Sequence, residues 1–380
     1  MKIVTDDRIP FIRGVFEPYA DVVYLPGAKT TPDDVRDADA VITRTRTRCD
    51  AGLLAGSKVK IVATATIGFD HIDTVWCENN GIAWKSAPGC NSGSVKQYVA
   101  SALVTLCRRH GLDFRNLTLG VVGVGNVGAK VVSAARAMGM KVLLNDPPRA
   151  RREGNGGFVP LEELIERADI ITLHVPLNRG GEYDTVHLFD AARLSSLRPG
   201  QILINSSRGP VVDNEVLKKI LASGGIRAAV LDVWENEPEP DPELVSLLDI
   251  CTPHIAGYSA DGKANGTMMS VRAVAEALDI EELKGWKVTD LPLPARSLGF
   301  SIDDAAPLSL QQLVERAVLH AYDVTEDSDA LRGDLAAFER LRGEYPVRRE
   351  FQAFTVRLRG ASASQVSALR QLGFNVIENQ

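Results

Sequence analysis

Cysteine is scarce in this 380-residue chain, and the few that occur are not paired in any recognisable motif. There are five cysteines, an odd number, and no Cys-x-x-Cys string occurs. The sequence thus gives no sign of a disulfide framework, and we expect reduced thiols. Cys90 lies in a loop of small residues with no helper histidine beside it, so we interpret it as a structural thiol. No group of His, Cys, Asp and Glu has metal-ligand spacing, and we expect no metal.

Long apolar runs and an excess of positive charge are also lacking. No apolar stretch approaches the roughly 18 residues that a membrane-spanning helix needs. Residues 1–7 lack the layout of a signal peptide and read as a first strand. The net charge is −6, whereas a general nucleic-acid-binding protein usually has a basic surface. The composition therefore favours a cytoplasmic protein with no membrane or nucleic-acid partner.

The first part of the chain alternates short β-rich runs with polar or helical stretches. Such alternation predicts a parallel α/β sheet, here of flavodoxin-like type. The expected strands of this part are Lys2–Thr5, Val22–Leu25, Ala40–Thr43, Lys60–Ala63 and Ile82–Trp84.

A second α/β series follows a long, largely buried helix at residues 93–110. It predicts a Rossmann-type doubly wound domain whose ligand crevice lies at the carboxyl ends of its strands. The expected strands are Thr118–Val122, Lys141–Leu144, Asp169–Leu173, Gln201–Ile204, Arg227–Leu231 and Asp249–Thr252.

The domain boundaries follow from these two series. A helical pattern over Ser259–Leu283 is expected to return to the first domain, which makes that domain discontinuous. We predict a substrate domain at 1–92 and 258–285, a cofactor domain at 93–257, and a small α+β domain at 286–380 used for dimerisation or regulation. The expected elements of the tail are helices at Leu308–Ala321 and Ser362–Leu372 and strands at Phe351–Leu358 and Phe374–Ile377.

A glycine loop, Gly123-Val124-Gly125-Asn126-Val127-Gly128, lies between a strand and a helical stretch. In that context Gly-x-Gly-x-x-Gly predicts a dinucleotide site, with pyrophosphate on the amides of the helix N-terminus. Asp146 closes the next strand, where a carboxylate accepts from a ribose 2′-hydroxyl and disfavours a 2′-phosphate. The sequence therefore favours NAD over NADP.

One cation, one carboxylate and one imidazole each follow an apolar strand further along the chain. These are Arg208, Glu237 and His254. Oxidation of a secondary alcohol needs a base for the hydroxyl proton, a cation for the substrate and a hydride acceptor. His254 suits the base, Glu237 could orient its ring, and Arg208 could hold a carboxylate. The alternatives are a structural loop histidine, a surface carboxylate and a helix-start residue.

Taken together, these strings resemble the D-isomer-specific 2-hydroxyacid dehydrogenases over residues 1–285. Arg208, Glu237 and His254 fall on the family's catalytic positions. The resemblance implies hydride transfer to NAD and a two-domain cleft. By position it also implies cofactor contacts at Gly123, Gly125, Asn126, Val127, Gly128, Asp146, Val175, Ser206, Ser207, Arg208, Asp232 and Gly257. Threonine is usual at position 175, so valine there could keep only a backbone contact.

Further strings resemble the branch of this family that oxidises 4-phospho-D-erythronate. They lie at residues 64–73, 86–91, 176–182 and 254–259 and in the tail at 345–350. This resemblance implies the product 3-hydroxy-2-oxo-4-phosphooxybutanoate, a place in pyridoxal 5′-phosphate synthesis and a homodimer formed through the C-terminal domain. It implies substrate contacts at Thr45, where serine is usual, and at Thr66 and Tyr258.

Arginines next to the first domain's strands suit a phosphorylated substrate. Arg44 and Arg46 follow the apolar strand at 40–43, and the fork of guanidinium donors matches phosphate. We predict that one of them binds the phosphate, and the alternative is a solvated basic loop. A further expectation places Arg348 or Arg349 of the partner subunit near the site, with an interface ion pair as the alternative.

Two other functions remain open. One is a different D-2-hydroxyacid dehydrogenase, such as a phosphoglycerate-oxidising enzyme, against which the tail and the loop at 87–91 argue. The other is a non-catalytic NAD-sensing protein that resembles the corepressors of this fold. Arg208, Glu237 and His254 are all present, which favours catalysis.

Overall fold

The computed structural model describes residues 1–154 and 156–379 and divides into two compact units. The first unit comprises residues 1–91 and 259–293, and the second comprises 92–258 and 294–380. The first part of the chain and the segment after residue 258 thus belong together. The tail groups with the cofactor part rather than forming a compact unit of its own.

The first unit contains a parallel sheet with strand order β2-β1-β3-β4-β5. This is the flavodoxin-like order expected from the sequence. Its strands are β1 (Lys2–Asp6), β2 (Asp21–Leu25), β3 (Ala40–Thr43), β4 (Ile61–Thr64) and β5 (Ala83–Lys85). Its helices are α1 (Pro32–Val35), α2 (Ala51–Leu54), α3 (Thr74–Asn79) and α11 (Ala260–Ala277), with 3-10 turns η1 (Gly27–Lys29) and η4 (Glu281–Leu283).

The second unit contains a larger parallel sheet with strand order β11-β10-β9-β8-β6-β7. An isolated parallel bridge between Leu144 and Phe158 extends it beyond β7 and completes the Rossmann order. The strands are β6 (Thr118–Val122), β7 (Lys141–Asn145), β8 (Ile170–Leu173), β9 (Ile202–Asn205), β10 (Ala228–Leu231) and β11 (Ile250–Cys251). Each expected strand is present, with ends shifted by no more than a residue or two.

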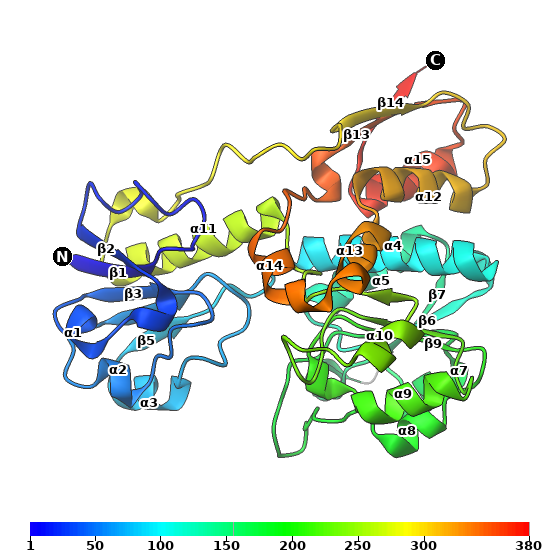
Figure 1. Ribbon diagram of the computed structural model, residues 1–380. Helices are drawn as coiled ribbons and strands as arrows, with labels where there is room; N and C mark the ends of the chain where they lie inside the picture. Colours follow the sequence, from blue (N-terminus) through cyan, green and yellow to red (C-terminus); the bar gives the residue numbers. More distant parts are fainter. Residues whose placement is uncertain (155, 380) are drawn as a thin grey trace. The chain divides into compact units, whose positions relative to one another are not determined.

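Helices cover both faces of this sheet, as a buried parallel sheet requires (Figure 1). One face packs against α4 (Ser92–His110) and α5 (Asn126–Ala137). The other packs against α7 (Leu161–Arg167), α8 (Ala191–Ser195), α9 (Asn214–Ala222) and α10 (Pro242–Leu247). The remaining elements of this part are α6 (Pro147–Glu153), η2 (Phe114–Asn116) and η3 (Gly209–Val211).

The tail adds a small parallel sheet, β12-β13-β14, only part of which was predicted from the sequence. Strand β12 and helices α13 and α14 were not expected, and residues 351–353 form a 3-10 turn rather than the start of a strand. The elements are β12 (Gly299–Ile302), α12 (Leu310–Ala321), α13 (Val324–Gly333), η5 (Leu335–Ala337), α14 (Phe338–Gly343), η6 (Phe351–Ala353), β13 (Thr355–Arg359), α15 (Ala363–Leu372) and β14 (Asn375–Asn379).

The tail is packed firmly onto the cofactor part of the second unit. Helices α12 and α15 lie against α4 and α5 and share one apolar core with them (Figure 1). Helix α13 lies along the edge strand β11, where the buried Ser328 hydroxyl accepts from the Cys251 amide at 3.1 Å. The tail therefore covers a sheet edge that would otherwise expose unpaired amides.

No helix among the described residues is long and apolar enough to cross a membrane. All five cysteine side chains are buried, and none of them forms a disulfide.

Candidate active site

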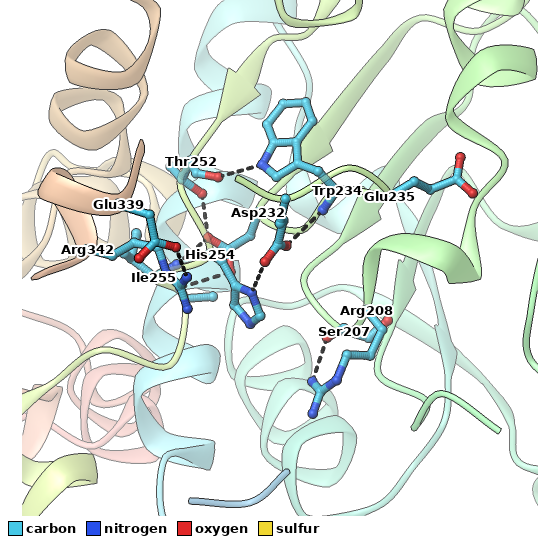
Figure 2. Close-up of polar contacts among 12 residues, drawn as sticks. Ser207, Arg208, Asp232, Trp234, Glu235, Thr252, His254, Ile255, Glu339 and Arg342 are labelled. Carbon is cyan, nitrogen blue, oxygen red and sulfur yellow. Dashed lines mark hydrogen bonds and ion pairs between the residues drawn. The ribbon is translucent and has the colours of Figure 1, made fainter. Parts of the chain in front are cut away.

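A buried carboxylate joins the loops that follow β10 and β11. Asp232 is 1% exposed. Its carboxylate accepts from the Thr252 hydroxyl at 2.6 Å and from the amides of Ile255 and Ala256 at 2.8 and 3.0 Å (Figure 2). Burial raises the pKa of Asp232, although the charge of His254 and these donors act in the opposite direction. Asp232 thus fixes the loop that carries His254.

His254 and Glu237 form the contact that the sequence predicted. The imidazole Nδ1 lies 2.8 Å from Glu237 Oε2, and the other carboxylate oxygen accepts from the Trp234 amide at 3.0 Å. His254 has a φ of 55°, and its amide donates to the Asp232 carbonyl at 2.7 Å. A left-handed residue other than glycine costs about 1 kcal/mol, so the surrounding bonds must hold it. This geometry leaves Nε2 as the ring nitrogen available to a substrate.

The Glu237 carboxylate is kept ionised by its partners. Burial acts to raise its pKa, but the hydrogen bond and charge of His254, the Trp234 amide and the nearby Arg342 outweigh burial and lower the pKa below its usual range. A carboxylate that stays charged can orient the imidazole and stabilise its protonated form.

Arg208 lies in the loop after β9, next in the sheet to β10. The fully buried Asn205 shapes this loop, because its amide donates to the Arg208 carbonyl at 2.9 Å and its oxygen accepts from Ser207. A Cβ on Gly209 would collide with the Trp234 carbonyl, so only glycine allows the two loops to approach this closely. The guanidinium is half-buried and donates to the Ser207 carbonyl at 2.8 Å (Figure 2).

The glycine loop has the backbone geometry that a dinucleotide needs. Gly123 has a φ of 84°, and a Cβ there would lie 2.6 Å from the His174 carbonyl oxygen. A Cβ on Gly128 would collide with the Gly123 carbonyl. Gly125 begins helix α5 without a side-chain cap, and Asn126 beside it is exposed. The first amides of α5 can therefore bind a pyrophosphate.

Asp146 holds the glycine loop in place. One carboxylate oxygen accepts from the Val124 amide at 2.8 Å, and the other accepts from the Arg149 amide at 2.9 Å. Each carboxylate oxygen has a second acceptor site, so a ribose hydroxyl can still be bound. Arg149 donates to the Val124 carbonyl at 2.6 Å and pairs with Glu153.

The other expected cofactor contacts fall into three groups. The Ser206 hydroxyl is buried and has no hydrogen-bond partner within the described residues, which suits a polar ligand. The side chain of Val175 lies close to Gly123, where it offers apolar contact only. Val127 lies in the first turn of α5, and Gly257 follows the anchored amides of Ile255 and Ala256. The set fits NAD.

The expected substrate residues of the first unit lie on loops after β3 and β4. Thr64 donates its hydroxyl to the Arg44 carbonyl at 2.8 Å, and Thr66 donates to the Gly68 carbonyl at 2.9 Å. Thr45 and Arg46 are exposed, and Arg44 donates to the Arg8 carbonyl at 3.2 Å. The two threonine hydroxyls, 2.8 Å apart, thus support the backbone that presents Arg44 and Thr45.

Residues of the tail also surround this site within the same chain, which was not predicted from the sequence. Tyr258, an expected substrate contact, has its ring 5.8 Å from that of Tyr345, edge to face. The guanidinium of Arg342, on α14, lies 5.8 Å from the Tyr258 ring and 3.2 Å from Glu339. Arg348 is bonded to the carbonyls just after His254. No pattern in the sequence connects these distant residues with the strands that precede Arg208, Glu237 and His254.

Among the described residues, no group of His, Cys, Asp and Glu is arranged to hold a metal ion.

Comparison with known proteins identifies close relatives. Residues 94–256 match the family described as the NAD binding domain of D-isomer specific 2-hydroxyacid dehydrogenases, and residues 301–373 match a domain of unknown function. An erythronate-4-phosphate dehydrogenase of Bacteroides fragilis is 50% identical over 94% of this chain and 99% of its own. One from Klebsiella pneumoniae is 42% identical over 100% of this chain and 99% of its own.

Solved structures show the same architecture. The D-lactate dehydrogenase of Aquifex aeolicus, complexed with NAD and lactic acid, is 26% identical with a TM-score of 0.62. The match covers 76% of this chain and 99% of that one. A formate dehydrogenase of Staphylococcus aureus in complex with NAD, at 21% identity and a TM-score of 0.59, shares the fold over 74% of this chain and 96% of its own.

His174, at the end of β8, gives a pH-dependent prediction. Its Nε2 lies 3.0 Å from the Thr172 hydroxyl, its Nδ1 is buried without a partner among the described residues, and burial lowers its pKa to about 3. The unfolded chain then binds a proton below about pH 6.5 that the folded protein does not, so stability falls as pH decreases from 6.5 towards 3. Between pH 6.5 and 4.5, the free energy of unfolding measured in urea should fall less steeply in His174→Gln than in the wild type. The two slopes should differ by up to about 1.4 kcal/mol per pH unit. Measurements at pH 8 provide the control, since the ring is neutral in both states there. Equal slopes in variant and wild type would contradict this prediction.

Proposed function

Since the chain belongs to the erythronate-4-phosphate dehydrogenase family within the D-isomer specific 2-hydroxyacid dehydrogenases, we propose that it oxidises 4-phospho-D-erythronate. The enzyme is an NAD-dependent oxidoreductase. The product of the proposed reaction is (R)-3-hydroxy-2-oxo-4-phosphooxybutanoate, in the synthesis of pyridoxal 5′-phosphate. The similarity supports this substrate because it extends over the tail as well as the cofactor domain.

The contact between His254 and Glu237 carries the proposed mechanism. With Nδ1 held 2.8 Å from the Glu237 carboxylate, His254 takes the proton of the substrate hydroxyl at Nε2. Glu237 stabilises the imidazolium that results. Arg208 binds the substrate carboxylate and polarises the oxygen that becomes a carbonyl. Bound NAD supplies the hydride acceptor.

The proposed roles of the remaining residues divide between binding and positioning. The α5 N-terminus, Asp146 and the Ser206 hydroxyl bind NAD, as their free amides, acceptor sites and unpaired hydroxyl suggest. Asp232 is proposed to hold the His254 loop while also lying beside the nicotinamide. Tyr258, Thr45 and Thr66 are proposed substrate contacts, for which family position is the main support.

We also propose a cytoplasmic location. Five buried thiols that form no disulfide are compatible with a reducing compartment, and the relatives are metabolic enzymes by name.

The reaction is tested by a substrate panel. NADH formation should be fastest with 4-phosphoerythronate and much slower with 3-phosphoglycerate and D-lactate. His254→Ala should lower kcat by at least about 100-fold, the range expected for loss of a general base, while the dissociation constant of NADH stays within about twofold. Faster turnover of another acid would reject the proposal that 4-phosphoerythronate is the substrate. Undiminished turnover by His254→Ala would reject the proposed role of His254 as the base.

The substrate phosphate is proposed to bind Arg44 or Arg46. In support, Arg44 is presented by a loop that two threonine hydroxyls brace. Arg48, nearby in the sequence, is paired with Asp50 at 2.6 Å and serves as a matched control.

The test compares 4-phosphoerythronate with D-erythronate in Arg44→Ala, Arg46→Ala and Arg48→Ala. Loss of one charged hydrogen bond, about 1.5–3 kcal/mol, should reduce the preference in kcat/KM for the phosphorylated acid by about 10- to 100-fold in one of the first two variants. Arg48→Ala should keep the wild-type preference. An unchanged preference in both Arg44→Ala and Arg46→Ala would exclude this role.

We also propose a homodimer formed through the tail. Helices α12 and α15 pack within the core beside one face of the β12-β13-β14 sheet (Figure 1). On the other face, Ser301, Arg357 and Ile377 are aligned across the three strands and exposed. Ile377 is 45% exposed in β14, an unusual position for an isoleucine.

Light scattering during gel filtration tests the dimer. The wild type should have twice the monomer mass, and Ile377→Asp should shift the mass towards that of a monomer. Val75→Asp is the control. Val75 is 66% exposed on α3, and it belongs to the first unit, whereas the tail sheet belongs to the second. A monomeric wild type, or an unaffected Ile377→Asp dimer, would count against a dimer through this face.

A further inference from the structure

The two peptide groups after His254 are bound from both sides. Ile255 and Ala256 are 0% and 1% exposed, so their amides and carbonyls must find partners within the protein. Asp232 accepts from both amides. Arg348 donates from Nη2 to both carbonyls, at 3.3 Å for Ile255 and 2.6 Å for Ala256. One carboxylate and one guanidinium thus fix the backbone that orients the imidazole.

Arg348 belongs to the tail, and other tail residues fix its position. Its guanidinium lies 4.4 Å from the centre of the Tyr322 ring, and Nη1 donates to the Tyr345 hydroxyl at 3.4 Å. Both tyrosine hydroxyls donate to the half-buried Asp327 carboxylate, at 2.6 and 2.7 Å. Two carboxylates thereby compensate the charge of Arg348. Asp327 lies within the tail, and Asp232 binds the amides of the peptide groups whose carbonyls Arg348 binds. Buried charges require such compensation.

This arrangement disfavours Arg348 as the residue that a partner subunit would contribute to the site, whereas the same expectation for Arg349 stays a prediction. Arg348 is 5% exposed and bonded within its own chain. Arg348 contacts the site indirectly, because it binds the same two peptide groups as Asp232.

We propose that Arg348 is a positioning residue for His254, so that the tail sets the geometry of proton transfer in its own subunit. The inference rests on the proposed role of His254 as the base. His254 adopts a φ of 55°, and a released Ala256 carbonyl would let this strained backbone relax and turn the ring away from Glu237. A misplacement of about 1 Å in a catalytic group can cost about 100-fold in rate.

The chain offers a matched control for this role. Arg332, also in the tail, donates to the carbonyls of Val245 and Leu248, at the end of α10 and ahead of β11 rather than in the loop that carries His254. Both arginines attach the tail to backbone carbonyls of the cofactor part of the same unit. Only Arg348 holds the residues that follow the proposed base.

The experiment compares Arg348→Met, Arg348→Lys and Arg332→Met in the full-length enzyme. Both methionine variants should lower the melting temperature. Arg348→Met should also lower kcat by about 10- to 100-fold, shift the pH at which kcat is half-maximal and raise the isotope effect with substrate deuterated at C2, while the NADH dissociation constant changes by less than about threefold. Arg348→Lys should recover part of kcat, because it keeps the charge but loses the fork of donors. Arg332→Met should keep kcat within about twofold.

A merely structural role predicts a different outcome. If Arg348→Met, corrected for its folded fraction, matches Arg332→Met in kcat and pH profile, the inference is overturned. Should Arg348→Met not fold, Tyr345→Phe decides: it removes the hydroxyl that contacts Arg348 and Asp327, and it should shift the kcat profile in the same direction. An unchanged profile in Tyr345→Phe would then reject the inference. Full activity in His254→Ala would instead reject the proposed mechanism itself.

Discussion

The candidate active site of this enzyme depends on the buried carboxylate of Asp232. It accepts from Thr252, Ile255 and Ala256 and so ties the loop after β10 to the loop after β11. A charge buried to this extent is costly unless each oxygen is hydrogen-bonded, and the three donors meet that requirement. The backbone cannot move there without leaving the carboxylate unpaired. His254 can therefore occupy a left-handed conformation that few residues adopt, and its ring meets Glu237.

The sheet explains why distant residues of the sequence meet. Strands β9, β10 and β11 are neighbours and parallel, so the loops that carry Arg208, Glu237 and His254 leave the same edge. The sequence alone was enough to predict this arrangement, because apolar runs, the glycine loop and strand-end polar residues each carry a local signal. It could also indicate Asp146, since the carboxylate follows a strand at the spacing that a dinucleotide site needs.

The tail was much harder to predict from the sequence. Strand β12 has only four residues and an exposed-to-buried pattern, and α13 is rich in acidic residues, so neither gives a strong periodic signal. The contacts of Arg348 and Ser328 join residues 92 and 77 positions apart. Such pairings arise from tertiary packing, on which local patterns carry no information. The same holds for Gly209, whose need for glycine comes from the close Trp234 backbone.

The tail also bears on how this enzyme differs from its structural neighbours. The structural matches to the lactate and formate dehydrogenases cover about three quarters of this chain but nearly the whole length of those two proteins. The part left over is close in length to the segment after residue 293 that packs onto α4, α5 and β11. In this chain, Arg348 of that segment donates to the carbonyls of Ile255 and Ala256, and the Ile255 carbonyl also accepts from the Tyr258 amide at 2.8 Å. Buried carbonyls are costly to leave unpaired, so without the tail the loop that carries His254 would have to open towards water, and its backbone would be less constrained. The tail and the active site are therefore physically one structure, whatever else the tail does.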